Sequence, residues 1–137
     1  MPDQPSSETS VSRRETILVV EDETHIRTWI VGILKQQGYK VLAAADGQEG
    51  LQISTDYSNT IDLMICDFRM PKMTGGELIK RVTPMRAAMK VICLSAAGAE
   101  SVSGFRAVTL LAKPFTLNGF LTTVKDVLGK PEDPKPA

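Results

Sequence analysis

Five side chains that could take part in chemistry stand at the ends of short apolar runs. They are two neighbouring carboxylates, a third carboxylate, a hydroxyl and an ammonium group: Glu21, Asp22, Asp67, Ser95 and Lys113. Apolar runs of this length are typical of buried strands, and a buried strand gains nothing from an ionised group at its end. The repeated placement of polar groups therefore indicates a site.

This set of groups is suited to handling a phosphoryl group. Carboxylates that lie close together repel and cannot all stay ionised without a counter-charge. Mg²⁺ meets that need at sites with one or two carboxylates and substrate phosphate oxygens. The lysine could pair with a phosphoryl oxygen, the serine could donate a hydrogen bond to another, and a carboxylate could act as nucleophile. We predict that Asp67 is the reacting group.

Each signal alone has an ordinary structural interpretation. An aspartate after a strand is most often a turn residue or a helix cap, and a Glu-Asp pair is most often the polar start of a helix. His25 is the single histidine of the chain, so it has no second histidine with which to bind a metal ion, and it is expected at the surface. Cys66 and Cys93 lack metal-site spacing and are expected to be buried and reduced. The joint placement at four strand ends favours the site.

The elements that must position these groups alternate along the chain. Apolar, β-branched runs predict strands at 16–20, 39–45, 62–66, 90–96 and 108–112. Helical spacing and caps predict a helix that has Thr24 as its N-cap and that Gly38 ends, and further helices at 46–55, 74–82 and 116–128. This alternation predicts an α/β doubly wound parallel sheet with helices on both faces. Ligands bind such sheets beyond the carboxyl ends of the strands.

Length and charge set outer bounds on the function. The 137 residues predict one domain at 16–129, a disordered segment at 1–15 and a Pro-rich tail at 130–137. Sixteen basic residues balance sixteen acidic ones, so there is no electrostatic footprint for nucleic acid or for a membrane surface. The polar N-terminus is not a signal peptide, and we expect a cytoplasmic protein.

Four stretches, in order, resemble the receiver domain of bacterial two-component response regulators. They are ILVVEDE (17–23), DLMICDFRMPKMTGGEL (62–78), VICLSA (91–96) and LLAKPF (110–115). The resemblance covers residues 16 to 129. It implies a flavodoxin-like, five-stranded sheet of strand order 2-1-3-4-5. It also implies a phosphoprotein of a two-component phosphorelay, which is a signalling switch and not an enzyme.

The resemblance assigns a role to each site residue. Asp67 would accept a phosphoryl group from a histidine kinase or a His phosphotransfer protein. Asp67 would also be a ligand of Mg²⁺. Asp22 would bind the ion directly, Glu21 through water, and Arg69 through its backbone carbonyl. Ser95 would be the switch hydroxyl, and Lys113 would pair with the phosphate. The Lys113–Pro114 peptide bond would be cis.

Two features depart from the family pattern. Leu110 occupies a position where the family usually has an aromatic switch residue. The stretch between Ser95 and Lys113 is shorter than is typical by about one helical turn and is rich in Gly and Ser. We therefore expect a fourth helix that is short or irregular, and a switch that is read through 96–112 without an aromatic rotamer.

Other interpretations stay open at this point. The chain could be a receiver excised from a hybrid sensor kinase. An aspartate-nucleophile phosphatase also places Asp at a strand end, but it needs a second Asp two residues later, where this chain has Arg69. A binding module that works without phosphorylation would not need Asp67, Asp22 and Lys113. The sequence does not identify the stimulus, the kinase or the downstream protein.

Overall fold

The computed structural model describes residues 14–95 and 108–129. Five strands lie in this part of the chain: β1 (Thr16–Val20), β2 (Lys40–Ala44), β3 (Leu63–Asp67), β4 (Lys90–Ser95) and β5 (Thr109–Ala112). The helices described are α2 (Thr24–Gln36), α3 (Gly47–Asp56), α4 (Gly75–Val82) and α5 (Leu117–Gly129). The predicted segments 1–15 and 130–137 and the predicted irregular fourth helix lie largely or wholly outside the described residues.

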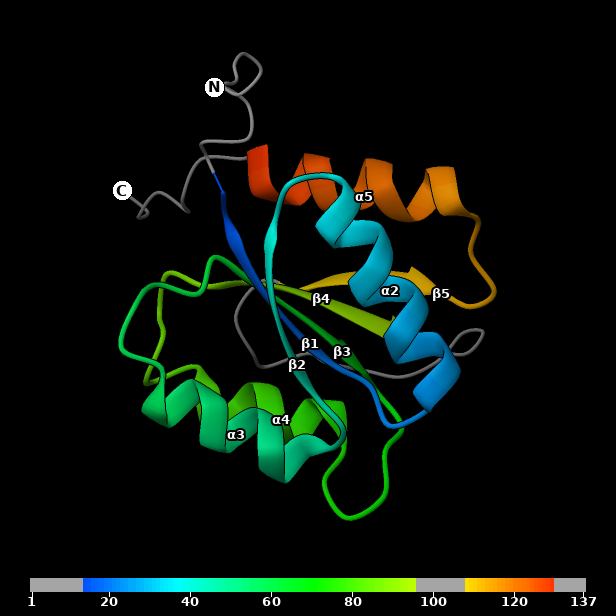
Figure 1. Ribbon diagram of the computed structural model, residues 1–137. Helices are drawn as coiled ribbons and strands as arrows, with labels where there is room; N and C mark the ends of the chain where they lie inside the picture. The colour runs from blue at the N-terminus through cyan, green and yellow to red at the C-terminus, as the bar shows by residue number, and fades with distance from the viewer. Residues whose placement is uncertain (1–13, 96–107, 130–137) are drawn as a thin grey trace.

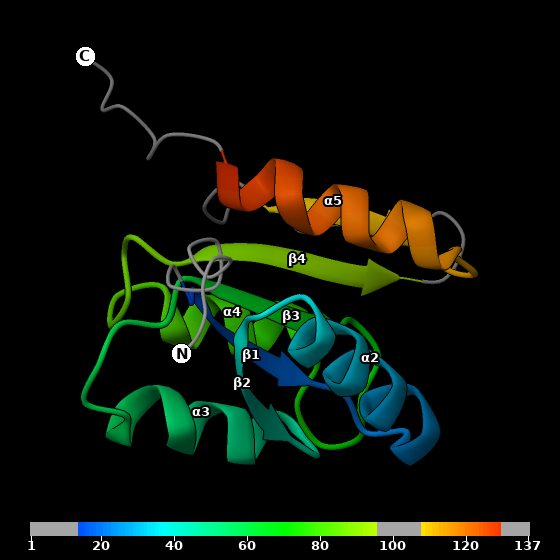
Figure 2. The same ribbon diagram turned by 45° about the horizontal axis from the view of Figure 1, so that its top comes forward.

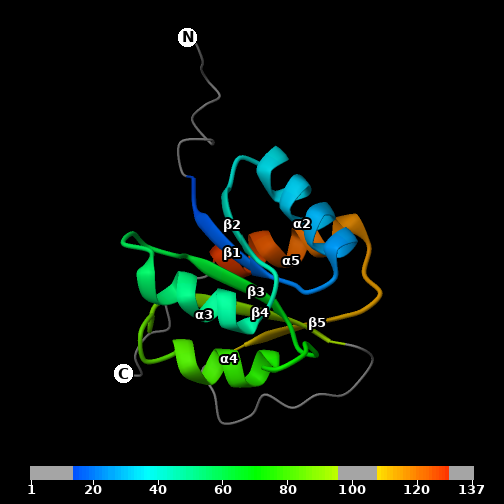
Figure 3. The same cartoon turned by 60° about the horizontal axis from the view of Figure 1, so that its bottom comes forward.

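The strands form one parallel sheet in the order β2-β1-β3-β4-β5. This confirms the predicted flavodoxin-like, doubly wound topology. Helices α2 and α5 cover one face of the sheet, and α3 and α4 cover the other (Figure 1). Figure 2 shows α5 lying along β4, and Figure 3 shows the α3–α4 layer from below. Among the described helices, none is long and apolar enough to cross a bilayer.

Two apolar cores flank the sheet because alternate strand residues point to opposite faces. On the α2–α5 side, Ile17 and Ile65 pack with Phe120, which is fully buried. On the α3–α4 side, Val20 and Leu78 belong to the second core. The three central strands β1, β3 and β4 are buried along nearly their whole length. In these three strands, polar side chains that take part in chemistry are therefore expected only at the strand ends.

Local signals in the sequence predicted the element ends to within a residue or two. Gly38, two residues beyond the end of α2, has φ 95°, and Asp46 accepts a hydrogen bond from the Glu49 N–H as the cap of α3. The predicted cap at Thr24 is wrong by one residue. Glu23 caps α2, because the Glu23 carbonyl already accepts the first helical hydrogen bond, from the N–H of Arg27.

We predict that the same Gly→Ala change has opposite effects in α2 and α3. A Cβ at Gly32 would have no atom within 4 Å, so Gly32→Ala should stabilise the protein by about 0.5–1 kcal/mol. A Cβ at Gly50 would lie 2.9 Å from Val20 Cγ2, so Gly50→Ala should destabilise it by about 1–2 kcal/mol. Equilibrium unfolding in urea measures the change in the free energy of unfolding for each variant. Changes of the same sign would contradict the packing described at Gly50.

Candidate functional site

Three carboxylates meet where β1 and β3 end. Glu21 and Asp22 directly follow β1, and Asp67 is the last residue of β3. One oxygen from each of the three lies within 4.8 Å of the others. Glu21 and Asp67 are only 1% and 6% exposed, whereas Asp22 is exposed at the rim. The sheet register explains the meeting, because Val20 pairs with Cys66 and the following residues continue side by side.

The ammonium group of Lys113 balances part of this charge. Its Nζ lies 3.1 Å from both Oδ1 and Oδ2 of Asp67. The lysine directly follows β5, and its backbone N–H donates to the carbonyl of Ser95 at 2.7 Å. The Lys113–Pro114 peptide bond is cis, as the resemblance implies. The end of β5 is thus fixed to the end of β4, the strand that lies between β5 and the Asp67-bearing β3.

The other two predicted site residues lie at the same edge of the sheet. Ser95 is the last residue of β4, is buried, and is one position beyond Leu94, which is paired with Asp67. Arg69 follows in the loop after β3, with its side chain exposed. Leu110, the residue at the usual aromatic position, is 47% exposed on β5. Most of the segment expected to report switching lies outside the described residues.

Burial and like charge raise the pKa values of the two buried carboxyl groups. Desolvation raises the pKa of Asp67, and Asp22 acts in the same direction, while the Lys113 pair and the Arg69 backbone N–H oppose them. Desolvation raises the pKa of Glu21 to about 7, against the opposing hydrogen bond from Glu23. Neighbouring carboxylates add to the rise and Lys113 reduces it. The site is therefore short of positive charge.

The donor set fits a divalent cation. Glu21 Oε2 accepts the Glu23 N–H at 3.0 Å, but the buried Oε1 has no hydrogen-bond partner among the described residues. A buried, unpaired carboxylate oxygen is costly unless water or an ion satisfies it. Hard oxygen donors of this kind suit Mg²⁺ or Ca²⁺. The cluster could therefore hold a metal ion.

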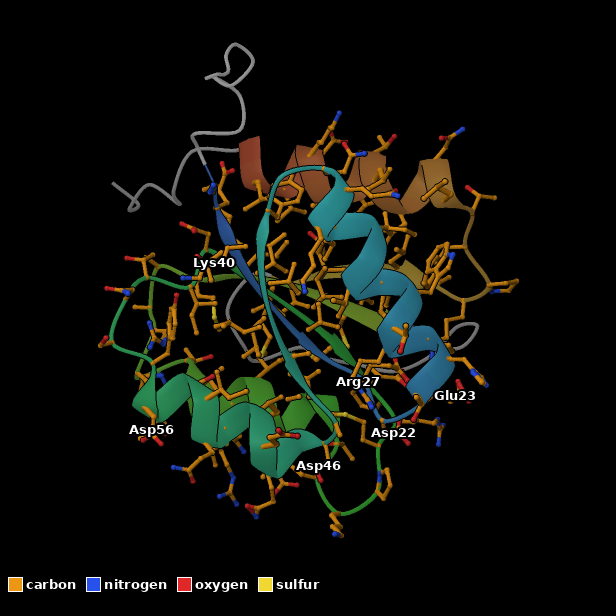
Figure 4. All side chains as sticks on the ribbon, in the orientation of Figure 1. Asp22, Glu23, Arg27, Lys40, Asp46 and Asp56 are labelled. Atoms are coloured by element: carbon orange, nitrogen blue, oxygen red, sulfur yellow. The ribbon has the colours of Figure 1, made fainter. Side chains whose placement is uncertain are left out.

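Sequence reasoning missed Arg27, which fixes the start of this site. Its Nη1 donates to the Glu21 carbonyl at 2.8 Å, across the first turn of α2. Figure 4 places Asp22, Glu23 and Arg27 around the start of α2, away from Lys40 and Asp56 at the other side of the molecule. The signal was a basic residue one turn into the helix that follows the acidic pair. Its long side chain can reach back to that pair.

Comparisons with known proteins agree with this fold. A model of the response regulator receiver domain matches residues 17–125. The sensor kinase CckA of Brucella abortus is 34% identical over 126 residues, which cover 89% of this chain but only 13% of that kinase. Sporulation initiation phosphotransferase F of Bacillus subtilis is 31% identical, with 83% of this chain and 94% of that protein covered.

Solved structures of receiver domains have the same fold. The receiver domain from the hybrid histidine kinase CckA superimposes with a TM-score of 0.71 at 36% identity, covering 82% of this chain and 98% of that one. The doubly wound sheet with acidic groups at its strand ends is thus the architecture of a response regulator receiver domain. The chain belongs to the response regulator receiver domain family.

We predict that Glu21 makes the metal-free protein less stable as pH rises from 4.5 to about 7. Over this interval the folded protein keeps a proton on Glu21 that the unfolded chain has released, so unfolding releases a proton and high pH favours unfolding. Glu21→Gln should flatten this slope, leaving the part due to Asp67. Urea unfolding at several pH values, without divalent ions, measures how the free energy of unfolding depends on pH. Asp126→Asn, on the exposed side of α5, is the control and should keep the wild-type slope.

Proposed function

We propose that the protein is a phosphorylatable signalling switch in which Asp67 accepts a phosphoryl group. The donor would be a histidine kinase or a His phosphotransfer protein. The observation that carries the proposal is the Asp67 carboxylate, buried at a strand end, paired through both oxygens with Lys113 and adjacent to two further carboxylates. Family membership and the likeness to a sensor kinase and a sporulation phosphotransferase support it.

The metal would be Mg²⁺. Asp22 and Asp67 would bind it directly, the backbone carbonyl of Arg69 would add a ligand, and Glu21 would act through water. When bound, the ion supplies charge neutralisation, which an anionic phosphodonor needs before it can approach three carboxylates. The exposure of Asp22 supports an ion that keeps several water ligands, as Mg²⁺ does.

The bonds that change in the transfer step belong to a nucleophile and a phosphohistidine. A carboxylate oxygen of Asp67 attacks phosphorus, the P–N bond to the donor imidazole breaks, and the electron pair leaves with the imidazole. Lys113 already lies at hydrogen-bond distance from Asp67, so its ammonium group can pair with a phosphoryl oxygen of the product. The Ser95 hydroxyl would donate to another oxygen. That contact exists only after phosphorylation and would signal the modified state.

Two further aspects belong to the same proposal. The module would act in the cytoplasm by protein–protein contact, without nucleic acid or membrane as a partner. It could stand alone or be the receiver of a hybrid sensor kinase, which the likeness to CckA favours. A phosphatase is disfavoured, because the position where such enzymes have a second aspartate as general acid carries Arg69.

We predict that acetyl phosphate adds one phosphoryl group to the protein, at Asp67, and only with a divalent cation present. Intact-mass measurement with Mg²⁺ and with EDTA tests this. Asp67→Asn should abolish the gain. Asp46→Asn is the matched control: Asp46 also follows a strand at this edge, and Asn caps a helix equally well.

Three results would contradict the proposal. They are a mass gain that survives Asp67→Asn, an equal gain in EDTA, and loss of the gain in Asp46→Asn. Turnover of a generic phosphate ester, with Asp67 released after each cycle, would favour the phosphatase instead.

A further inference from the structure

The loop that follows Asp67 is held tightly at its first residue. It spans residues 68–74 and runs from the end of β3 to the start of α4 (Figure 1). The Phe68 N–H donates to the Leu94 carbonyl at 2.8 Å, and the Phe68 carbonyl accepts the Gly75 N–H at 2.7 Å. Phe68 therefore has both backbone groups engaged. It lies directly between Asp67 and Arg69, the residues proposed to face the metal.

Gly75 makes this closure possible because it has no side chain. A Cβ at this position would lie 2.5 Å from the Asp67 carbonyl oxygen and 2.9 Å from Phe68 Cα. Both are backbone atoms, so no side-chain rotation could relieve the contact. Any other residue would push the end of β3 and the start of α4 apart. The position of Gly75 therefore requires a residue without a side chain, because it lies against the backbone of Asp67, which bears the carboxylate proposed to react.

The far part of the loop is held by a second close approach. Met73 is 5% exposed, and a Cβ at Gly47, the first residue of α3, would lie 2.9 Å from Met73 Cβ. The Met73 N–H donates to the Pro71 carbonyl at 2.7 Å across Lys72, whose φ is 72°. A γ-turn with positive φ at a non-glycine residue is rare and strained. Such a turn persists only where its surroundings determine it.

We propose that Gly75 is a positioning residue for phosphoryl transfer: it allows the loop 68–74 to close on β3 and so fixes the Asp67 carboxylate and the Arg69 carbonyl relative to each other. The inference rests on the proposed function, because it assigns this geometry to metal binding. Metal ligands must sit within about 0.2 Å of their ideal distances. A Cβ that forces backbone atoms to move by several tenths of an ångström would spoil that geometry without touching the metal.

The test compares Gly75→Ala with a core variant of the same helix. Mg²⁺ affinity is measured by isothermal titration calorimetry at a temperature where circular dichroism shows each variant folded. We expect Gly75→Ala to weaken binding by about 10-fold or more, as loss of a supporting contact does in metal sites. Val82→Ala removes buried side-chain volume from the other end of α4 and should destabilise the fold. It should change the affinity by less than about two-fold, because distant sites couple weakly.

A second readout needs no metal. Amide NMR spectra of the metal-free protein should show large shifts at Asp67 and Arg69 in Gly75→Ala but not in Val82→Ala. If Gly75→Ala does not fold, Gly47→Ala, which presses on Met73 at the other contact, should weaken Mg²⁺ binding in the same direction.

The positioning role is overturned by any of three results. The first is wild-type Mg²⁺ affinity in folded Gly75→Ala, and the second is equal weakening in Val82→Ala. The third applies where Gly75→Ala does not fold, and is wild-type affinity in Gly47→Ala. If the wild-type protein binds no Mg²⁺, the proposed metal site fails, and the metal-free shifts at Asp67 and Arg69 alone decide whether Gly75 positions the strand end.

Discussion

The burial of Glu21 and Asp67 beside the ammonium group of Lys113 is the constraint on which the site depends. Two carboxylates that are almost fully buried, with Asp22 close by, carry more negative charge than one lysine can balance. Desolvation, and then repulsion from neighbouring carboxylates, raise the pKa of both buried groups. In the function proposed above, the remaining imbalance would make the site receptive to a cation and then to the phosphoryl group of an anionic donor.

The fold holds that imbalance in place. Central strands buried on both faces leave no polar positions except at their ends, and parallel pairing brings those ends to one edge. Apolar cores on the two sides of the sheet stabilise the strands, so the protein can tolerate an unfavourable cluster at their tips. The Arg27 contact with the Glu21 carbonyl and the closure of Gly75 on Asp67 then fix the two strand ends locally.

The sequence predicts the parts of this arrangement that depend on pattern. Alternating apolar runs and caps lead to the doubly wound sheet, and the residues at run ends lead to the carboxylates and Lys113. Pattern does not distinguish Glu21 from Asp22, although one is buried and the other exposed, because that depends on how α2 leaves the sheet. It also does not find the role of Gly75, since a contact with the Asp67 backbone exists only after the loop has closed. The cap at Glu23 instead of Thr24 shows the same limit on a smaller scale.

The central claim is that the carboxylate cluster is a cation site, and ligand-linked stability tests it most directly. The thermal unfolding midpoint should be measured above pH 7, where Glu21 is ionised, as Mg²⁺ is added. An ion that binds only the folded protein must raise the midpoint with concentration. We predict such a rise in the wild-type protein and its loss in Asp22→Asn. No rise in the wild type, or an equal rise in Asp22→Asn, would contradict the account.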